Sequence, residues 1–166
     1  MGAALALRGD LEGPQTLSGG TVRDEPARWQ ALADGTGCPI CRDGEPLDVL
    51  VERGASWITS GDRVPVAGYV CVSSTRHFVE PYQLPPFECG ACWDDVLFAA
   101  ERVARILEPI KPNYEIHGNT LPHLHVQVFP CFRGDRFIGG AIDPRGEPVL
   151  QSPDQLARLR AALTIR

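Results

Sequence analysis

The segment His123-Leu124-His125-Val126-Gln127 constrains this chain more than any other, because polar and apolar residues alternate along it. Successive side chains of a strand point to opposite faces, so His123, His125 and Gln127 share one face, and Leu124 and Val126 share the other. Core packing explains the apolar face, but it does not explain two imidazoles and a carboxamide together. The pattern predicts a strand whose polar face carries chemistry, with a merely solvated face as the alternative.

The residue types on this face suit substitution at a phosphorus atom. A neutral imidazole is a nucleophile at physiological pH, since its unperturbed pKa is about 6.5. A histidine that attacks phosphorus forms a covalent intermediate, which divides one difficult displacement into two easier ones. A neighbouring carboxamide can donate a hydrogen bond to a phosphoryl oxygen without competing as a nucleophile.

Several short strand-like runs, separated by turn residues, occur along the chain, and the histidine segment is the last of them. One long run of residues at helical spacing lies between two of these strand-like runs. The first three runs lie too close together for crossover helices, which favours an α+β fold with an antiparallel sheet of about five strands. Trp93 and Leu97 are expected on the buried stripe of the long helix. The expected strands are Leu47–Glu52, Ser56–Thr59, Gly68–Ser73, Asn113–His117 and His123–Phe129, and the expected helices are Phe87–Leu107 and one that begins at Ser152-Pro153-Asp154-Gln155.

Residues 1–37 are rich in glycine, polar and charged residues and have no sustained period, so they predict a loose extension with one short helix around Glu25–Ala33. The remaining residues, 38–166, are expected to form one domain. The formal net charge of -5 lacks the basic footprint of a nucleic-acid-binding protein. No apolar run is long enough for a bilayer, and Met1–Leu7 is too short for a signal peptide, so a cytoplasmic protein without membrane partners is expected.

Six cysteines include two Cys-x-x-Cys pairs, Cys38-Pro39-Ile40-Cys41 and Cys89-Gly90-Ala91-Cys92. Their spacing, without a signal peptide, favours metal binding over disulfides. Two thiolates at this spacing can bind one tetrahedral zinc ion, which then needs two further ligands. Three possibilities remain open at this point: a mixed cysteine and histidine site, an all-cysteine site built from both pairs, and no metal.

The segment Pro122–Pro130 resembles the motif of the histidine triad (HIT) superfamily, in which three histidines alternate with apolar residues. Gln127 replaces the last histidine, as in the galactose-1-phosphate uridylyltransferase and dinucleoside tetraphosphate phosphorylase branch. Gly118–Pro122 is similar to the glycine-and-amide loop of the family, and Gly68–His77 resembles the strand that leads to an earlier family histidine. The resemblance extends from Cys38 to Arg136 and implies a HIT-like fold for residues 38–166.

The resemblance also assigns roles to individual residues. It implies that His125 is the nucleophile and that Gln127 and Asn119 hold phosphoryl oxygens. Zinc-containing members of the superfamily use an opening Cys-x-x-Cys, the histidine after the third strand and the first histidine of the motif. These positions imply a structural zinc site at Cys38, Cys41, His77 and His123.

The implied activity is that of a nucleotidyl hydrolase acting on the α-phosphate of a dinucleoside polyphosphate or related nucleotide conjugate, through a covalent nucleotidyl-histidine. Because Gln127 marks a transferase branch, a nucleotidyltransferase or phosphorylase that uses a phosphate acceptor is an alternative. A zinc-stabilised nucleotide-binding module without turnover is another. Homodimers are common among HIT hydrolases, so the resemblance implies a homodimer.

Four further residues stay open. Cys131 stands where many relatives carry an arginine, and Arg133 or Arg136 could supply that phosphate contact or be exposed loop residues. His117 either lines the pocket or is a hydrogen-bonded structural histidine.

Overall fold

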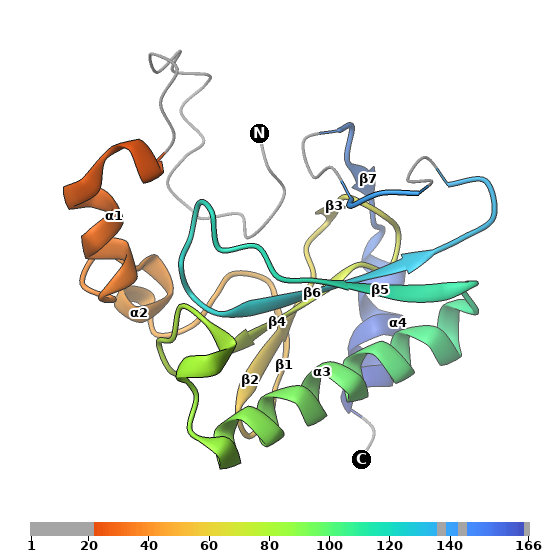
Figure 1. Ribbon diagram of the computed structural model, residues 1–166. Helices are drawn as coiled ribbons and strands as arrows, with labels where there is room; N and C mark the ends of the chain where they lie inside the picture. The colour runs from red at the N-terminus through yellow and green to blue at the C-terminus, as the bar shows by residue number, and fades with distance from the viewer. Residues whose placement is uncertain (1–21, 136–138, 143–145, 165–166) are drawn as a thin grey trace.

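The computed structural model describes residues 22–135, 139–142 and 146–164 (Figure 1). Five strands form one antiparallel sheet in the order β1-β2-β4-β6-β5, and β3 and β7 form a small second sheet. The predicted α+β fold is therefore confirmed. The strands are β1 (Val49–Glu52), β2 (Ser56–Thr59), β3 (Arg63–Val64), β4 (Val70–Ser74), β5 (Lys111–Glu115), β6 (His125–Cys131) and β7 (Val149–Leu150).

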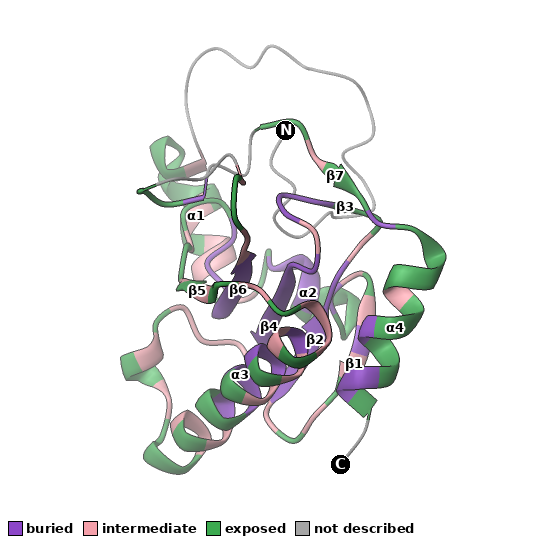
Figure 2. Cartoon of the chain, turned by 90° about the vertical axis from the view of Figure 1, so that its right-hand side faces the viewer, coloured by how far each residue is buried: buried purple, intermediate pink, exposed green. Residues whose placement is uncertain are grey.

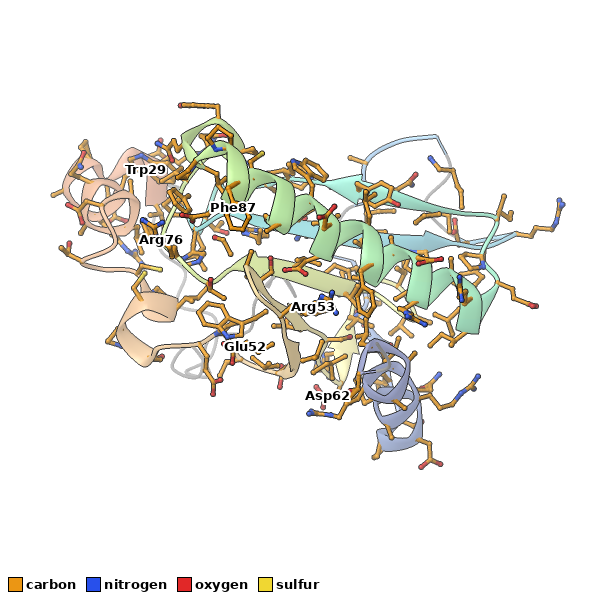
Figure 3. All side chains as sticks on the ribbon, turned by 90° about the horizontal axis from the view of Figure 1, so that it is seen from below. Trp29, Glu52, Arg53, Asp62, Arg76 and Phe87 are labelled. Atoms are coloured by element: carbon orange, nitrogen blue, oxygen red, sulfur yellow. The ribbon has the colours of Figure 1, made fainter. Side chains whose placement is uncertain are left out.

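The helices of the described residues are α1 (Pro26–Ala33), α2 (Pro39–Asp43), α3 (Pro86–Leu107) and α4 (Pro153–Thr164), with 3-10 turns at Val22–Asp24 and Pro81–Gln83. Helices α3 and α4 cover one face of the large sheet, and Figure 3 shows α3 crossing that face. Figure 2 shows the central strands β2, β4 and β6 buried and the outer surfaces of α3 and α4 exposed. The core between sheet and helices is apolar and consists of Leu50, Ile58, Val70, Val72, Val96, Ala99, Ala100, Val103, Val126, Val128, Leu159 and Leu163.

The opposite face of the sheet carries the polar residues. Ser73 pairs with His125 and Cys71 with Gln127 across β4 and β6, while Glu115 of β5 pairs with Gln127 from the other side. Directly paired residues of antiparallel strands project to the same face. The alternation within β6 therefore places these side chains away from α3 and α4. A second apolar cluster covers part of this face, formed by Val64, Val66, Tyr69, Cys71, Phe129 and Ile142.

The predicted long helix and C-terminal helix are confirmed, and the first two strands, β1 and β2, pair as an antiparallel hairpin. Ser152 and Gln155 form the predicted capping box, because each backbone N–H donates to the other side chain. The expectation for Trp93 and Leu97 is wrong, since these side chains are 37% and 56% exposed. The buried stripe of α3 is narrower than predicted and contains Cys92, Asp95, Val96, Ala99, Ala100 and Val103.

Several strand boundaries differ from the predicted ones. Strand β6 begins at His125, so His123 precedes the strand, and β5 ends at Glu115, so His117 follows it. Strand β5 instead reaches back to Lys111 and includes Pro112, which lacks a backbone donor and is tolerated because β5 is an edge strand. The two-residue strands β3 and β7 were not predicted, because they are too short to show a period.

The first Cys-x-x-Cys pair lies on α2. Cys38 precedes the helix in extended conformation, Pro39 occupies its first turn, and Gly44 ends it with a φ of 86°. Proline suits the first turn of a helix and glycine suits a left-handed C-terminus, so the local sequence fixes this short helix. No helix within the described ranges has the length and apolar character needed to cross a membrane.

Candidate functional site

His125 is buried in β6, with 6% of its surface exposed, and its ring orientation is fixed. Nδ1 lies 2.7 Å from the backbone oxygen of His123. A carbonyl oxygen only accepts, so Nδ1 carries the proton and Nε2 presents its lone pair. Burial lowers the pKa of His125 below its usual 6.5, although the hydrogen bond to His123 opposes this effect. The ring is therefore neutral near pH 7 and has the state that a nucleophile needs.

Gln127 lies two residues further along β6 on the same face and is 3% exposed. Its Oε1 is fully buried, and no hydrogen-bond partner for it lies among the described residues. The buried hydroxyl of Tyr69 is also unpartnered within that part of the chain. Buried polar atoms without partners are rare in folded proteins, so a carboxamide in this state is a ligand-binding candidate.

Asn119 lies in the exposed loop between β5 and β6. Its Oδ1 accepts a hydrogen bond of 3.4 Å from Nη1 of Arg23, which leaves the amide nitrogen as a donor for a ligand. Within the described ranges, no hydrogen bond joins Asn119 to His125 or Gln127. Arg23 was not predicted, because an isolated arginine in a segment without periodicity gives no signal.

The four predicted metal ligands lie together, with one ligand atom from each within 4.8 Å of all the others. Sγ of Cys38 is 3.4 Å from Nδ1 of His123, and Sγ of Cys41 is 3.3 Å from Nδ1 of His77. The two Nδ1 atoms are 3.3 Å apart. The cluster joins α2, the segment after β4 and the segment before β6.

The hydrogen bonds behind the cluster orient both rings toward a cation. Nε2 of His77 donates to the backbone oxygen of Ala33 at 3.0 Å, and Nε2 of His123 donates to that of Ser74 at 2.9 Å. Both Nδ1 atoms therefore present lone pairs to each other, an arrangement that is repulsive unless a cation lies between them. Backbone carbonyls that hold the second ring nitrogen are typical of metal-binding histidines.

The protonation preferences of the cluster fit the same conclusion. Burial lowers the pKa of His123 to about 4, so its ring is neutral and available as a ligand. Desolvation and the neighbouring Cys38 raise the pKa of the Cys41 thiol to about 11, so a cation is needed for this thiol to be a thiolate near neutral pH. Two thiolates and two imidazoles that fill four positions fit a structural zinc ion.

The second Cys-x-x-Cys pair lies apart from this cluster. Cys89 and Cys92 belong to the first turns of α3, and Sγ of Cys92 is 3.8 Å from the hydroxyl of Ser56. The four-residue cluster contains neither of them. The geometry therefore favours the mixed site over an all-cysteine site.

The remaining open positions lie around the end of β6. Cys131 ends the strand, and its Sγ accepts a hydrogen bond of 3.0 Å from Nδ2 of Asn113. Arg133 is exposed in the following turn, and Arg136 lies outside the described residues. His117 forms an ion pair of 2.8 Å with Glu115, a residue that the sequence did not single out because one glutamate in a strand has no distinctive pattern.

Comparison with known proteins relates this arrangement to one fold. No family model matches the chain, and no curated protein matches it. Among solved structures, a histidine triad protein from Bradyrhizobium japonicum is 17% identical with a TM-score of 0.61 over 69% of this chain and 86% of that one. A histidine triad protein from Marinobacter aquaeolei is 20% identical with a TM-score of 0.61 over 70% and 85%.

A zinc-bound histidine triad family protein from Mycobacterium smegmatis is 20% identical, with a TM-score of 0.59 over 77% of this chain and 94% of that one. Identities at this level establish a shared fold and leave activity to be argued from the site itself. The chain therefore has the fold of the histidine triad proteins.

Proposed function

We propose that this protein is a nucleotidyl hydrolase that attacks the α-phosphate of a dinucleoside polyphosphate or related nucleotide conjugate with Nε2 of His125. One observation carries the proposal: the 2.7 Å hydrogen bond from Nδ1 to the backbone oxygen of His123 leaves Nε2 of a buried, neutral ring with a free lone pair. The fold and the His-x-His-x-Gln sequence support the same reading.

In this mechanism Nε2 of His125 forms a bond to the α-phosphorus while the bond to the leaving group breaks. Gln127 and the amide nitrogen of Asn119 donate hydrogen bonds to phosphoryl oxygens, on which negative charge accumulates. Water then attacks the nucleotidyl-histidine, releases a nucleoside monophosphate and restores the neutral ring. The hydrogen bond to His123 holds the ring in one orientation through both steps.

We further propose that Cys38, Cys41, His77 and His123 hold a zinc ion, as their donor set favours. With all four positions filled by protein, the ion stabilises the fold and does not activate water. Its effect on the reaction is to hold the segment before β6, from which the His123 carbonyl reaches His125.

Labelled diadenosine polyphosphates test the activity directly. Incubation is expected to yield labelled nucleoside monophosphate and, after rapid denaturation at alkaline pH, a labelled protein. Acid should release this label, because phosphorus–nitrogen bonds to histidine are acid-labile. No adduct and no product, together with tight nucleotide binding, would indicate a binding module without turnover. That result would overturn the enzyme proposal.

The phosphorylase alternative rests on Gln127, which stands in place of the last histidine of the motif. The same assay with and without inorganic phosphate separates the two reactions. A hydrolase forms nucleoside monophosphate at a rate independent of phosphate. A phosphorylase instead forms nucleoside diphosphate in proportion to the phosphate added.

A further inference from the structure

The pair of Glu115 and His117 lies at the end of β5, the strand that pairs with the β6 strand of the proposed nucleophile. Oε2 of Glu115 accepts from Nε2 of His117 at 2.8 Å, and Oε1 accepts from the backbone N–H of Ile142 at 2.9 Å. Both carboxylate oxygens are therefore engaged, which fixes the glutamate. Its side chain is 13% exposed, whereas that of His117 is 48% exposed.

The sheet register places this pair on the polar face of β6. Glu115 is the direct partner of Gln127, so the two side chains project to the same side. His117 is two residues beyond Glu115, and the ion pair keeps its ring on that side. The pairing of β5 with β6 ends at Glu115 and Gln127, and His117 lies just beyond it, toward the end of β6 that carries His125. Burial is the main cause of the lowered pKa of His125, and an electrostatic interaction with His117 adds to it, so the two rings lie within electrostatic range.

One nitrogen of the His117 ring is held and the other is available. The carboxylate of Glu115 engages Nε2, and no hydrogen bond from the described residues reaches Nδ1. A carboxylate that holds one ring nitrogen fixes the orientation of the ring and balances the charge of the imidazolium. The opposite nitrogen can then give and take a proton.

The proposed reaction needs such a group. Displacement of an alkoxide, amide or phosphate from phosphorus is faster when the departing atom receives a proton. Gln127 cannot supply one, because a carboxamide does not titrate in the accessible range, and the same holds for Asn119. His125 cannot supply one either, since its Nδ1 proton is bound to the His123 carbonyl and its Nε2 is the nucleophile.

We propose that His117, oriented by Glu115, is the proton donor to the leaving group and afterwards the base that accepts a proton from the attacking water. This inference rests on the proposed nucleotidyl-transfer function and assigns His117 as a catalytic residue and Glu115 as a positioning residue.

Nε2 of His125 forms a bond to the α-phosphorus, the electron pair of the bond to the leaving group goes to the departing atom, and that atom takes the proton from Nδ1 of the His117 imidazolium. Water then bonds to the phosphorus, its proton goes to the neutral Nδ1 of His117, and the electron pair of the phosphorus–nitrogen bond returns to His125. Both histidines end in their starting states.

Two nucleotide conjugates with the same adenylyl group and different leaving groups test this assignment. The p-nitrophenyl ester of AMP releases a stable anion that needs no proton, whereas the methyl ester of AMP releases an alkoxide that does. His117→Gln is expected to lower kcat/KM for the methyl ester by about 10² to 10⁴-fold, the usual contribution of general acid catalysis. For the p-nitrophenyl ester, kcat/KM is expected to stay within a few-fold of the wild type.

The second step provides an independent readout. Without its base, His117→Gln should release one equivalent of p-nitrophenolate rapidly, then turn over slowly, with adenylylated protein accumulating. Glu115→Gln, which retains an acceptor but loses the charge, is expected to show the same leaving-group dependence with a smaller loss. Tyr114→Phe, an exposed neighbour on β5, is the matched control and should behave like the wild type.

Equal losses of kcat/KM for both esters in a His117→Gln variant with wild-type circular dichroism and zinc content would overturn the assignment of His117. The wild-type protein would then still form the adduct, so the proposed function would stand. If the wild type formed no adduct with either ester, the proposed function itself would fail. Should His117→Gln not fold, Glu115→Gln provides the same comparison.

Discussion

At the scale of single residues, His125 is the position on which the proposed chemistry depends. His125→Ala removes the nucleophile, so kcat/KM should fall by at least about 10³-fold, as when nucleophiles are removed from other covalent enzymes. The fold should be retained, because the apolar core lies on the other face of the sheet. Steady-state kinetics, circular dichroism and zinc analysis of the variant check this, and wild-type activity would show that the nucleophile is elsewhere.

Cys71 gives the protein a predictable response to alkali. Burial raises the pKa of its thiol from 9.0 to about 11. Above pH 9 the unfolded chain loses this proton while the folded protein keeps it, so the free energy of unfolding falls as pH rises from 9 to 11. The loss attributable to this thiol should approach about 3 kcal/mol, at about 1.4 kcal/mol for each pKa unit.

Urea unfolding between pH 8 and pH 10.5, under reducing conditions, measures this effect. Cys71→Ala should weaken the decline of the free energy of unfolding with pH, because other groups such as Tyr69 remain in both proteins. Parallel curves for the wild type and the variant would contradict the prediction.

At the scale of secondary-structure elements, Asp95 joins α3 to the turn between β1 and β2. Its carboxylate accepts from Nε of Arg53 at 2.7 Å and from the backbone N–H of Ala55 at 3.3 Å. Asp95→Ala leaves both donors without this partner and should destabilise the fold by about 2 kcal/mol. Glu101→Ala, which removes an exposed pair with Arg105 on the same helix, should cost no more than about 0.5 kcal/mol. Equal losses in urea unfolding would argue against the role given to Asp95.

The start of α4 depends on the hydroxyl of Ser152, which accepts from the backbone N–H of Gln155 at 3.2 Å. Ser152→Ala should lower the free energy of unfolding by about 1 kcal/mol, the usual cost of losing a helix N-cap. Ser152→Asp restores an acceptor and should recover most of the loss. If Ser152→Asp were as destabilised as Ser152→Ala, the cap would not be the cause.

The same scale shows what the sequence can and cannot predict. The long helix α3 and the capping box of α4 follow from strong local patterns, and the short helix α1 also formed where residues 25–33 predicted it. The ends of β5 and β6 do not follow from local patterns, because pairing across the sheet determines where a strand stops. Exposure of Trp93 and Leu97 depends on how widely the sheet contacts α3, which no local pattern encodes.

The residues of the candidate site also differ in whether the sequence could predict them. The two Cys-x-x-Cys pairs and the alternating histidines stand out by their spacing, but only the resemblance to the histidine triad motif indicated which of these residues form the site. The Glu115–His117 pair and the contact of Arg23 with Asn119 could not be predicted, because both depend on tertiary structure. The first depends on the course of the chain beyond β5. The second joins residues that are 96 positions apart in sequence.

At the scale of the whole molecule, the cluster on α2 closes long loops of the chain, since Cys38 and His123 are 85 positions apart. Removing one ligand should therefore affect global stability. Cys38→Ala is expected to lose zinc and to unfold at lower temperature, whereas Cys89→Ala should keep one equivalent of zinc and most of its stability. Elemental analysis after gel filtration and thermal unfolding test both. Loss of zinc from Cys89→Ala would favour the all-cysteine site instead.

His123 faces the cluster with its side chain and holds the His125 ring with its backbone oxygen. The zinc site and the proposed nucleophile therefore both depend on this one residue. A population that is gradually depleted of zinc should lose turnover in step with its metal content, well before the bulk of the fold melts. In cells short of zinc, the zinc-free molecules of this protein would then be inactive. They would not process nucleotides with altered fidelity.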